Sequence, residues 1–165
     1  MHGDPKLYEI LNQLHIPFDY YEHPPVPTIE EAKIYWKDID ATHCKNLFFR
    51  NHKGDHHYLV ILDHMQQLDI HDMEGRLKQG KISFASEQRM AKYLGIKPGS
   101  VSPFGLINDV QKHVHVFFDI NLQKSKMISF HPNINTADLI IPFSDFMNFM
   151  DWTGNRYDFL QLYDL

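Results

Sequence analysis

Cysteine is nearly absent from this 165-residue chain, and long apolar runs are absent altogether. The single cysteine, Cys44, cannot form an internal disulfide, which is usual for proteins of a reducing cytoplasm. Apolar runs such as LVIL at residues 59–62 have the length of a strand and are too short to span a membrane. The N-terminal stretch MHGDPKLYEI lacks the basic start and apolar block of a secretory signal. The sequence therefore predicts a cytoplasmic protein.

Positive charge is also scarce, because 16 Lys and Arg residues stand against 21 Asp and Glu, for a formal net charge of -5. A protein that coats nucleic acid along its length needs many cations to neutralise phosphates, so that class is excluded. Contact with only the tip of a nucleic acid is compatible with this charge. No repeat, low-complexity tract or linker divides the chain, so we expect one domain over residues 1–165.

Hydrophobic periodicity and capping residues predict alternating strands and single helices. Asp4 and Pro5 begin the first helix, Thr28 and Glu31 form a capping box at the second, and Gly95 ends a later one. Helices are expected within residues 3–16, 28–36, 68–80, 86–95 and 144–154. Strands are expected at residues 18–23, 45–50, 57–62, 82–85, 114–119, 126–131 and 137–143. This order predicts an α+β fold with a curved mixed β-sheet flanked by helices.

Lys45 is the first candidate functional residue, because it stands directly in front of the apolar strand residues LFF. Most lysines in such a place are simply solvated. Alternation along the strand, however, puts Lys45, Leu47 and Phe49 on one face. If that face points inward, the ammonium lies at the rim of an apolar pocket and needs an anion, such as a phosphate or a developing oxyanion. Its neighbour Asn46 can both donate and accept hydrogen bonds.

Two loops supply further candidates. The segment KPGSVSPFG at residues 97–105 reads as an ordinary surface turn or as a rigid loop that presents backbone N–H groups to a carbonyl oxygen or phosphate. His131 ends a strand and begins a polar turn. It is either part of that turn alone, or a hydrogen-bond donor or proton carrier at the same pocket as Lys45.

Metal and nucleophile chemistry have weaker support. His113 and His115 share a strand face and could hold a metal with a third ligand, but no HExxH or CxxC motif accompanies them, so we expect no metal and no cofactor. Cys44 would need a suitably oriented histidine to act as a nucleophile, and nothing local supplies one. Cys44 is therefore expected to be a small buried hydrophobic residue. No carboxylate–histidine couple is evident beside Lys45.

Five segments, taken in order, resemble the prolyl-tRNA synthetase-associated editing family, which includes an inserted synthetase domain and free-standing relatives. They are EHPPVPTIEEA, CKNLFFRNHKGDHHYLVIL, ISFAS, LGIKPGSVSPFGLIND and SFHPNINTADL. The chain is most similar to the free-standing proteins that hydrolyse alanine from mischarged tRNA(Pro). The resemblance implies a fold of the YbaK/aminoacyl-tRNA synthetase-associated domain type and a trans-editing deacylase without a cofactor. Its partners would be the acceptor end of tRNA(Pro) and prolyl-tRNA synthetase, with neither membrane nor DNA.

The same resemblance assigns roles to residues. Lys45, Asn46 and His131 are implied to be catalytic, with Lys45 as a substrate anchor because a base would need severe desolvation. The ribose 2′-hydroxyl of the substrate is implied to assist a positioned water. The residues implied to bind substrate are Thr28, Gly99, Ser100, Ser102, Pro103, Phe104 and Gly105. Pro27 stands where relatives often carry a larger apolar residue, which bears on amino-acid preference.

Three alternatives stay open at this point. One is a deacylase of the same family that removes cysteine or another amino acid from its tRNA. A second is a non-catalytic module that binds a tRNA 3′ end or a synthetase. A third is a histidine-dependent metallohydrolase.

Overall fold

The computed structural model describes residues 1–26 and 28–165; Pro27 lies outside the described residues. The helices are α1 (Pro5–Gln13), α2 (Ile29–Trp36), α3 (Ile70–Leu77), α4 (Glu87–Leu94) and α5 (Phe143–Thr153), with 3₁₀ helices η1 (Pro103–Asn108) and η2 (Ile120–Lys124). The strands are β1 (Asp19–Glu22), β2 (Thr42–Asn51), β3 (His57–Asp63), β4 (Ile82–Phe84), β5 (His115–Asp119), β6 (Met127–Phe130), β7 (Ala137–Pro142) and β8 (Tyr157–Leu160). The predicted α+β class is confirmed.

The capping residues named from the sequence stabilise the starts of α1 and α2. The Asp4 side chain accepts the Lys6 N–H at 3.0 Å, and Pro5 opens α1. Thr28 Oγ1 accepts the Glu31 N–H at 3.2 Å at the start of α2. These side chains satisfy amide groups that a helix start leaves without a backbone partner, so local sequence fixes where each helix begins.

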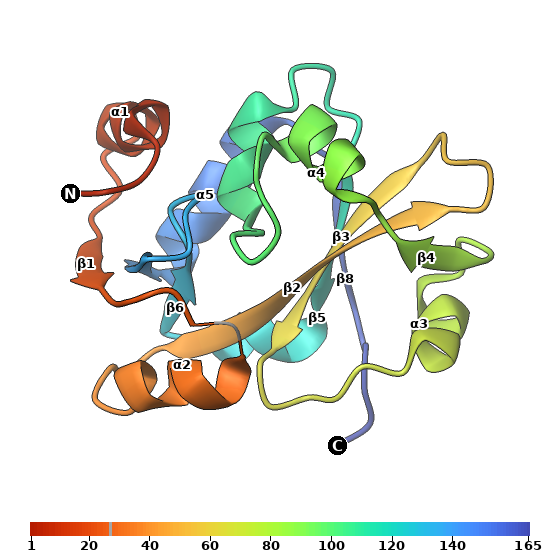
Figure 1. Ribbon diagram of the computed structural model, residues 1–165, viewed down its shortest axis with the longest axis horizontal. Helices are drawn as coiled ribbons and strands as arrows, with labels where there is room; N and C mark the ends of the chain where they lie inside the picture. Colours follow the sequence, from red (N-terminus) through yellow and green to blue (C-terminus); the bar gives the residue numbers. More distant parts are fainter. Residues whose placement is uncertain (27) are drawn as a thin grey trace.

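Within the described residues, eight strands form one mixed sheet in the order β1-β7-β6-β2-β3-β5-β8, with β4 paired to β2 (Figure 1). The β2–β3 pair is an antiparallel hairpin, as predicted, and Gly54 in its turn has a φ of +75°. The pairs β2–β6, β3–β5 and β5–β8 are parallel. β2 is therefore the joint between the part of the sheet that holds β1, β7 and β6 and the part that holds β3, β5 and β8.

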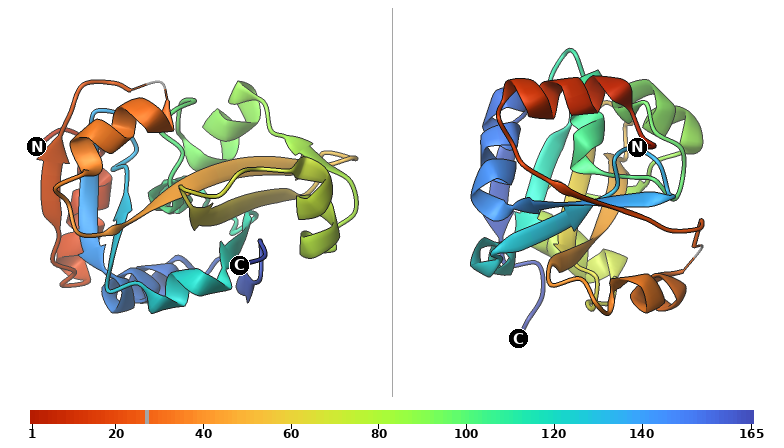
Figure 2. Two further views of the ribbon diagram at one scale, coloured as in Figure 1. Left: turned by 90° about the horizontal axis from the view of Figure 1, so that it is seen from below. Right: turned by 90° about the vertical axis from the view of Figure 1, so that its left-hand side faces the viewer.

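β2 separates two apolar clusters. Its Phe48 faces the larger cluster, to which α1, α4, η1 and α5 contribute, whereas Leu47 and Phe49 face a smaller cluster that includes Met73 and Leu77 of α3. In Figure 1, α4 and α5 lie above β2, and α2 and α3 lie below it. Figure 2 shows the long hairpin reaching away from β1, β7 and β6 toward β4 and α3. The alternation predicted along β2 is therefore observed: Leu47 and Phe49 lie on one face of the strand, and Phe48 lies on the other.

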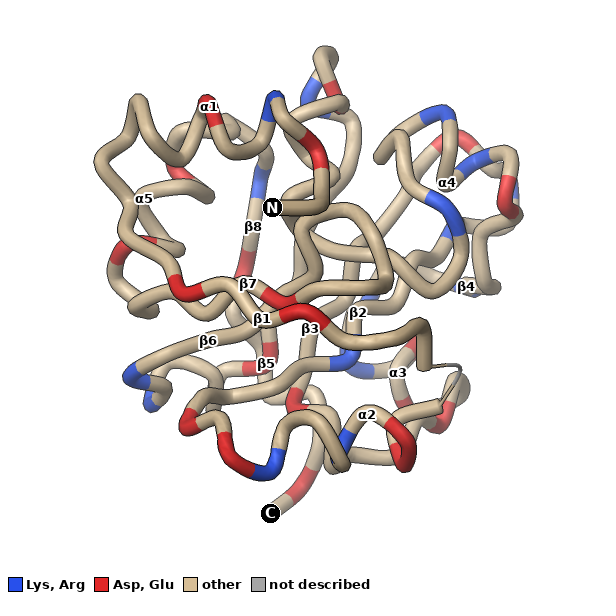
Figure 3. Tube along the Cα trace, turned by 60° about the vertical axis from the view of Figure 1, so that its left-hand side comes forward, with Lys and Arg blue, Asp and Glu red and all other residues tan. Residues whose placement is uncertain are grey.

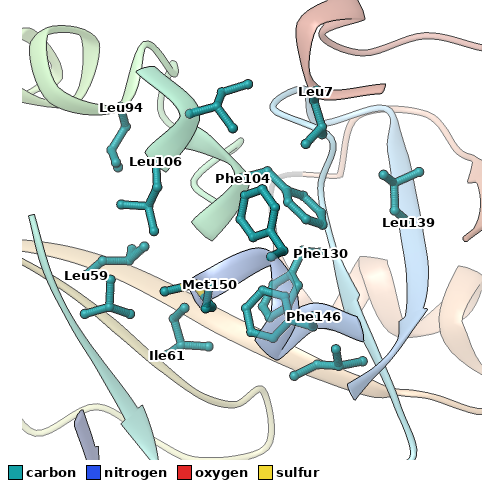
Figure 4. Close-up of a cluster of buried hydrophobic side chains, with 14 of the residues drawn as sticks. Leu7, Leu59, Ile61, Leu94, Phe104, Leu106, Phe130, Leu139, Phe146 and Met150 are labelled. Carbon is teal, nitrogen blue, oxygen red and sulfur yellow. The ribbon is translucent and has the colours of Figure 1, made fainter. Parts of the chain in front are cut away.

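The segment 96–109 was expected to be an irregular shaped loop, but much of it is the buried 3₁₀ helix η1. Ser102 caps this helix, since its Oγ accepts the Phe104 N–H at 3.1 Å. The Phe104 ring has no exposed surface and packs edge-on against Phe130 and Phe149, at centroid distances of 5.9 and 5.2 Å (Figure 4). A 3₁₀ helix of six residues with Pro and Gly has no 3.6-residue pattern, which is why its apolar residues do not show in the sequence as a helix.

Two elements were not predicted from the sequence, η2 and β8. β8 pairs in parallel with β5, and all four of its residues are half-buried. With four residues, of which Tyr157 and Phe159 share the face that packs on the larger cluster, the strand is too short to give a clear alternation in the sequence. Among the described residues, no helix has both the length and the apolar character needed to cross a bilayer.

Candidate active site

A cavity opens where β2 loses its neighbours on one edge. On that edge β6 pairs only with Thr42 and His43, and β4 pairs only with residues 49–51. Over residues 44–48 no described strand occupies this edge, so the sheet forks there. The cavity in the fork has a volume of about 400 Å³, within the usual range for small-molecule sites.

The main chain of β2 presents polar groups at this free edge. The His43 carbonyl accepts the His64 N–H on the β3 side, whereas the Phe48 carbonyl accepts the Ala85 N–H on the opposite side. Since backbone groups alternate between the two edges of an antiparallel strand, Cys44 and Asn46 direct theirs toward the fork. Buried backbone groups of this kind need partners, and a ligand in the cavity can supply them.

The cavity is walled by segments that are distant in the sequence. α2 and the segment before it form one wall, β2 forms the floor, and residues around Gly99 and His131 form the other wall. The lining residues from α2 and its N-terminal approach include His23, Val26, Thr28, Ile29, Ala32, Tyr35 and Trp36. The remaining ones are Cys44, Lys45, Asn46, Leu47, Leu68, Gly99, Val101 and His131. Apolar and polar side chains thus share one chamber, and the sheet residue Lys45 and the turn residue His131 meet there.

Lys45 brings a positive charge into the cavity without a carboxylate to neutralise it. Its Nζ donates to the Gln66 carbonyl oxygen, and none of the ion pairs among the described residues involves Lys45. Burial, and next the nearby Lys33, lower the pKa of Lys45 from its usual value. An ammonium has three N–H donors, so two remain for a ligand. An anion bound here would stabilise the ammonium by its opposite charge and so offset both effects on the pKa.

Asn46 and the loop after α4 add neutral hydrogen-bonding groups. Asn46 Oδ1 is buried and has no hydrogen-bond partner among the described residues, so it can accept a hydrogen bond from a ligand. In the loop, the N–H groups of Ser100 and Gly105 already donate to Lys97 and Ser102 carbonyls. The backbone hydrogen bonds of the described residues include none from the N–H of Gly99, which lines the cavity. A carbonyl or oxyanion near this wall would therefore find a free donor.

A buried carboxylate connects two histidines at the cavity wall, which the sequence analysis missed. Asp138 Oδ1 lies 3.1 Å from His131 Nδ1, and Asp138 Oδ2 lies 3.1 Å from His23 Nε2. The Trp36 indole N–H of α2 also donates to Asp138 Oδ2, at 3.1 Å. The expectation that no carboxylate–histidine couple exists at the site is therefore wrong.

The protonation of these groups follows from their partners. His23 Nδ1 lies 2.8 Å from the Pro24 carbonyl oxygen, and Nε2 lies 3.1 Å from Asp138 Oδ2 without forming an aligned hydrogen bond, so the contact of Nε2 with the carboxylate is one of charge and proximity. The Asp138 carboxylate raises the pKa of His23, against the opposing effect of burial. Burial alone would raise the pKa of Asp138, but the contacts with His131 and His23 outweigh it and hold that pKa well below its usual range. Asp138 and His23 thus form a buried ion pair.

This trio is also the one group among the described residues whose ligand atoms lie close enough together, within 4.8 Å, to hold a metal. A metal would have to bind His131 at Nδ1, the nitrogen that faces Asp138. The Ala137 carbonyl oxygen, however, lies 2.9 Å from the same Nδ1 and needs a proton there. The trio therefore fits a hydrogen-bonded ion-pair network better than a metal site.

The other histidines proposed as metal ligands point to different partners. His113 Nε2 lies 2.9 Å from His57 Nδ1, whereas His115 Nε2 lies 2.6 Å from Asp158 Oδ2. Cys44 lines the cavity as a half-buried side chain, and burial raises the pKa of its thiol, so it is protonated at neutral pH. Neither the histidine pair nor the thiol supplies a reactive group to the cavity.

Five residues expected to bind substrate do not line the cavity. They are Ser100, Ser102, Pro103, Phe104 and Gly105, and all five are buried. Ser102 and Phe104 are used in capping η1 and in the core, and a Cβ at Gly105 would collide with the Ile96 side chain. Of the implied site residues, Lys45, Asn46, His131, Thr28 and Gly99 do line it, and the Thr28 hydroxyl also caps α2.

The Asp138–His23 pair predicts a pH dependence of stability. The pKa of His23 is higher in the folded state, so its contribution is complete below about pH 6.5 and is lost as pH rises through the raised pKa. The pKa of Asp138 is lower in the folded state, so its contribution is complete above about pH 3.9 and is lost as pH falls toward the lowered pKa. The pair therefore stabilises the fold most between about pH 4 and pH 6.5.

His23→Gln is expected to lower the free energy of unfolding by about 1.5–3 kcal/mol at pH 5.5, the usual range for hydrogen bonds to charged groups. The loss should be smaller at pH 9, because the contribution of His23 in the wild type declines as pH rises through its raised pKa. Urea unfolding at both pH values measures it, with the exposed His56→Gln as the control. A loss of the same size at both pH values would contradict an ion pair.

Comparison with known proteins points in one direction. The sequence pattern of the aminoacyl-tRNA editing domain family matches residues 23–149. The prolyl-tRNA editing protein ProX of Acetoanaerobium sticklandii is 40% identical over 153 residues, covering 92% of this chain and 93% of the relative. The prolyl-tRNA synthetase associated domain-containing protein 1 of Mus musculus is 30% identical over 153 residues, covering 91% of this chain and 90% of the relative.

A solved structure supports the same fold. The crystal structure of a candidate trans-editing enzyme for prolyl-tRNA synthetase superimposes with a TM-score of 0.68, over 96% of this chain and 98% of the other. At 17% sequence identity, this likeness concerns the fold alone.

Proposed function

The chain belongs to the aminoacyl-tRNA editing family and is an aminoacyl-tRNA hydrolase, and we propose that it acts in trans on mischarged tRNA(Pro) to remove alanine. One observation carries the assignment to this cavity. The ammonium of Lys45, without a carboxylate partner, and the open acceptor Asn46 Oδ1 share a chamber of about 400 Å³. Such a chamber takes the aminoacyl end of a tRNA and no more of it.

The substrate is an ester between the amino acid and the terminal ribose. A synthetase discriminates poorly against an amino acid that is too small, because one missing methylene is worth only about 1–3 kcal/mol. A second site that admits the small amino acid and excludes proline completes the selection. Ile29, Ala32 and Leu47 are apolar residues of the cavity wall and supply such a steric limit. Alanine is the amino acid proposed, and cysteine is the alternative.

Lys45 holds the substrate through its phosphate or through charge on the carbonyl side. It has two N–H donors left and no carboxylate partner among the described residues, so it is suited to binding an anionic group of the substrate. Asn46 Oδ1 accepts a hydrogen bond from a hydroxyl or amino group of the bound end. Together they fix the ester relative to the cavity wall.

Hydrolysis then proceeds by addition and elimination. The oxygen of water bonds to the ester carbonyl carbon, and negative charge develops on the carbonyl oxygen; the N–H of the cavity residue Gly99 is the donor proposed to stabilise it. The bond from the carbonyl carbon to the ribose oxygen breaks, and that oxygen takes a proton. The products are free alanine and tRNA with a free hydroxyl. The ribose 2′-hydroxyl helps to position the water.

The charge distribution suits contact with the acceptor end. Acidic and basic residues are interspersed over the face shown in Figure 3, in keeping with a net charge of -5. A protein of this kind gains little from the phosphates along a tRNA and must use its cavity for affinity. We therefore propose the tRNA(Pro) acceptor end as the direct partner, prolyl-tRNA synthetase as a second partner, and the cytoplasm as the location.

A deacylation panel tests the proposal. The protein is incubated with tRNA(Pro) charged with alanine, cysteine, serine or proline, and loss of the ester is followed over time. We expect rapid loss of alanine and negligible loss of proline, because proline is larger than the cavity limit allows. Rapid loss of cysteine in place of alanine would keep the reaction and change the substrate. If all four esters were lost only at the spontaneous rate, the protein would be a binding module and the proposal that it acts as an enzyme on these substrates would be wrong.

A further inference from the structure

We propose that Asp138 is a positioning residue for this reaction, which fixes the ring of His131 so that its Nε2 faces the ester in the cavity. The inference rests on the proposed function and extends it to a group that the sequence analysis did not name. Its basis is the contact geometry of four residues from separate segments: His23 after β1, Trp36 of α2, His131 after β6 and Asp138 of β7.

The first step concerns the proton on His131. Two acceptors, Asp138 Oδ1 at 3.1 Å and the Ala137 carbonyl oxygen at 2.9 Å, lie against Nδ1. Nδ1 therefore carries the proton, and in the neutral ring Nε2 is left with a lone pair. Because Nδ1 is directed into β7 and the ring lines the cavity, Nε2 is the nitrogen available to the chamber.

The second step concerns the charge on Asp138. Its side chain is only 3% exposed; its second oxygen accepts the Trp36 N–H and lies 3.1 Å from His23 Nε2. The buried His43 of β2 also faces this charge: Asp138 raises the pKa of His43, against the larger lowering effect of burial. These groups keep the carboxylate ionised and fixed, so it can orient His131 as the carboxylate of a catalytic triad orients its histidine.

The third step is the chemistry this allows. His131 Nε2 accepts the proton of the attacking water while the water oxygen bonds to the carbonyl carbon. The same proton passes to the ribose oxygen when its bond to the carbonyl carbon breaks. His131 ends in its starting state, and water is consumed by the ester. Asp138 touches neither substrate nor water; it acts through His131.

Asp138→Asn tests the proposal, with alanyl-tRNA(Pro) as substrate. It removes the charge and leaves the shape, so we expect kcat to fall about 10- to 100-fold while KM changes by less than about threefold. Asp119→Asn is the matched control. Asp119 is equally buried and accepts the N–H groups of Asn121 and Leu162, but it does not line the cavity. It should lower stability and leave kcat unchanged.

A double-mutant cycle distinguishes positioning from general structural damage. His131→Ala is expected to lower kcat about 100-fold, and adding Asp138→Asn to it should cost nothing further, because Asp138 has then lost the group it positions. Should Asp138→Asn fail to fold, Trp36→Phe removes one hydrogen bond to Oδ2 and keeps the ring that stacks on His43 at 4.4 Å. We expect it to lower kcat about threefold in the wild type and not at all beside His131→Ala.

The outcomes separate this inference from the proposed function. If the wild type hydrolyses none of the charged tRNAs, the proposed function is wrong. If the wild type is active and Asp138→Asn keeps its kcat, or if the Asp138 and His131 effects multiply, the positioning role is wrong. A fall in kcat that disappears beside His131→Ala supports it.

Discussion

Lys45→Ala is expected to lower kcat/KM for alanyl-tRNA(Pro) by about 100- to 1,000-fold, the range that follows loss of one electrostatic donor at a reacting carbonyl. Lys45 supplies a cation to the cavity with no carboxylate partner among the described residues, so its charge is available to the substrate. Single-turnover hydrolysis at saturating enzyme measures the effect on the chemical step, and a titration of enzyme measures the effect on binding.

Two variants make this result specific. Lys53→Ala removes an exposed cation from the β2–β3 turn, away from the cavity, and should leave kcat/KM within about twofold. Lys45→Arg keeps the charge with a different shape and should recover only part of the activity. Full activity in Lys45→Ala with intact circular dichroism would show that the anion is held elsewhere.

Ala32→Phe is the second substitution with a large expected effect. Ala32 is 5% exposed and lies on the side of α2 that lines the cavity, so a phenyl ring there must occupy the chamber or displace the helix. We expect hydrolysis of alanyl-tRNA(Pro) to fall by about 100-fold, with a cost in stability of about 1–3 kcal/mol from overpacking. Deacylation kinetics and urea unfolding measure the two effects separately.

Ile34→Phe is the matched control on the same helix. Ile34 is 64% exposed and does not line the cavity, so the same ring added there should change neither quantity appreciably. Undiminished hydrolysis in Ala32→Phe would mean that the amino acid does not bind beside α2, and the steric limit would then have to come from the opposite wall.

Local signals were sufficient for much of the fold. Asp4 and Thr28 mark helix starts because their side chains satisfy exposed amide groups within three residues. The apolar run Leu47, Phe48 and Phe49 indicates a strand buried on both faces. In β2 the successive side chains point alternately to two separate apolar clusters. Such signals depend only on residues that are close together in the sequence, so they can be recognised without knowledge of the tertiary structure.

The site depends on contacts across the chain, and there the sequence was less informative. Asp138 reads as one polar residue at the start of an apolar strand, although its carboxylate is the centre of the histidine network. A signal did exist: β6 and β7 pair as Phe130 with Leu139, and continuing that register places His131 opposite Asp138. The contact with His23 follows from the β1–β7 register in the same way, since Tyr21 pairs with Asp138 and His23 continues that strand on the same face.

For the loop after α4, the sequence prediction assigned too many residues to the site. Pro103 and Gly105 are typical of surface loops, and they suggested that the whole stretch forms the wall of the site. In the structure, tight packing against the core uses these residues, and only the first part of the stretch, around Gly99 and Val101, reaches the cavity. Composition alone does not distinguish a loop that packs inward from one that faces a ligand.

The fork at β2 separates the parts of the site that must stay constant from those that can vary. Lys45 and Asn46 sit within a ten-residue strand that β3 holds along one edge and β6 and β4 hold at the two ends of the other. α2, by contrast, lies over the fork and pairs with no strand, so its apolar cavity residues Ile29 and Ala32 can change size without altering the register of the sheet, whereas Trp36 is held by its hydrogen bond to Asp138. A family built on this plan can diverge toward new amino acids by substitutions in one short helix while its hydrolytic chemistry is inherited intact.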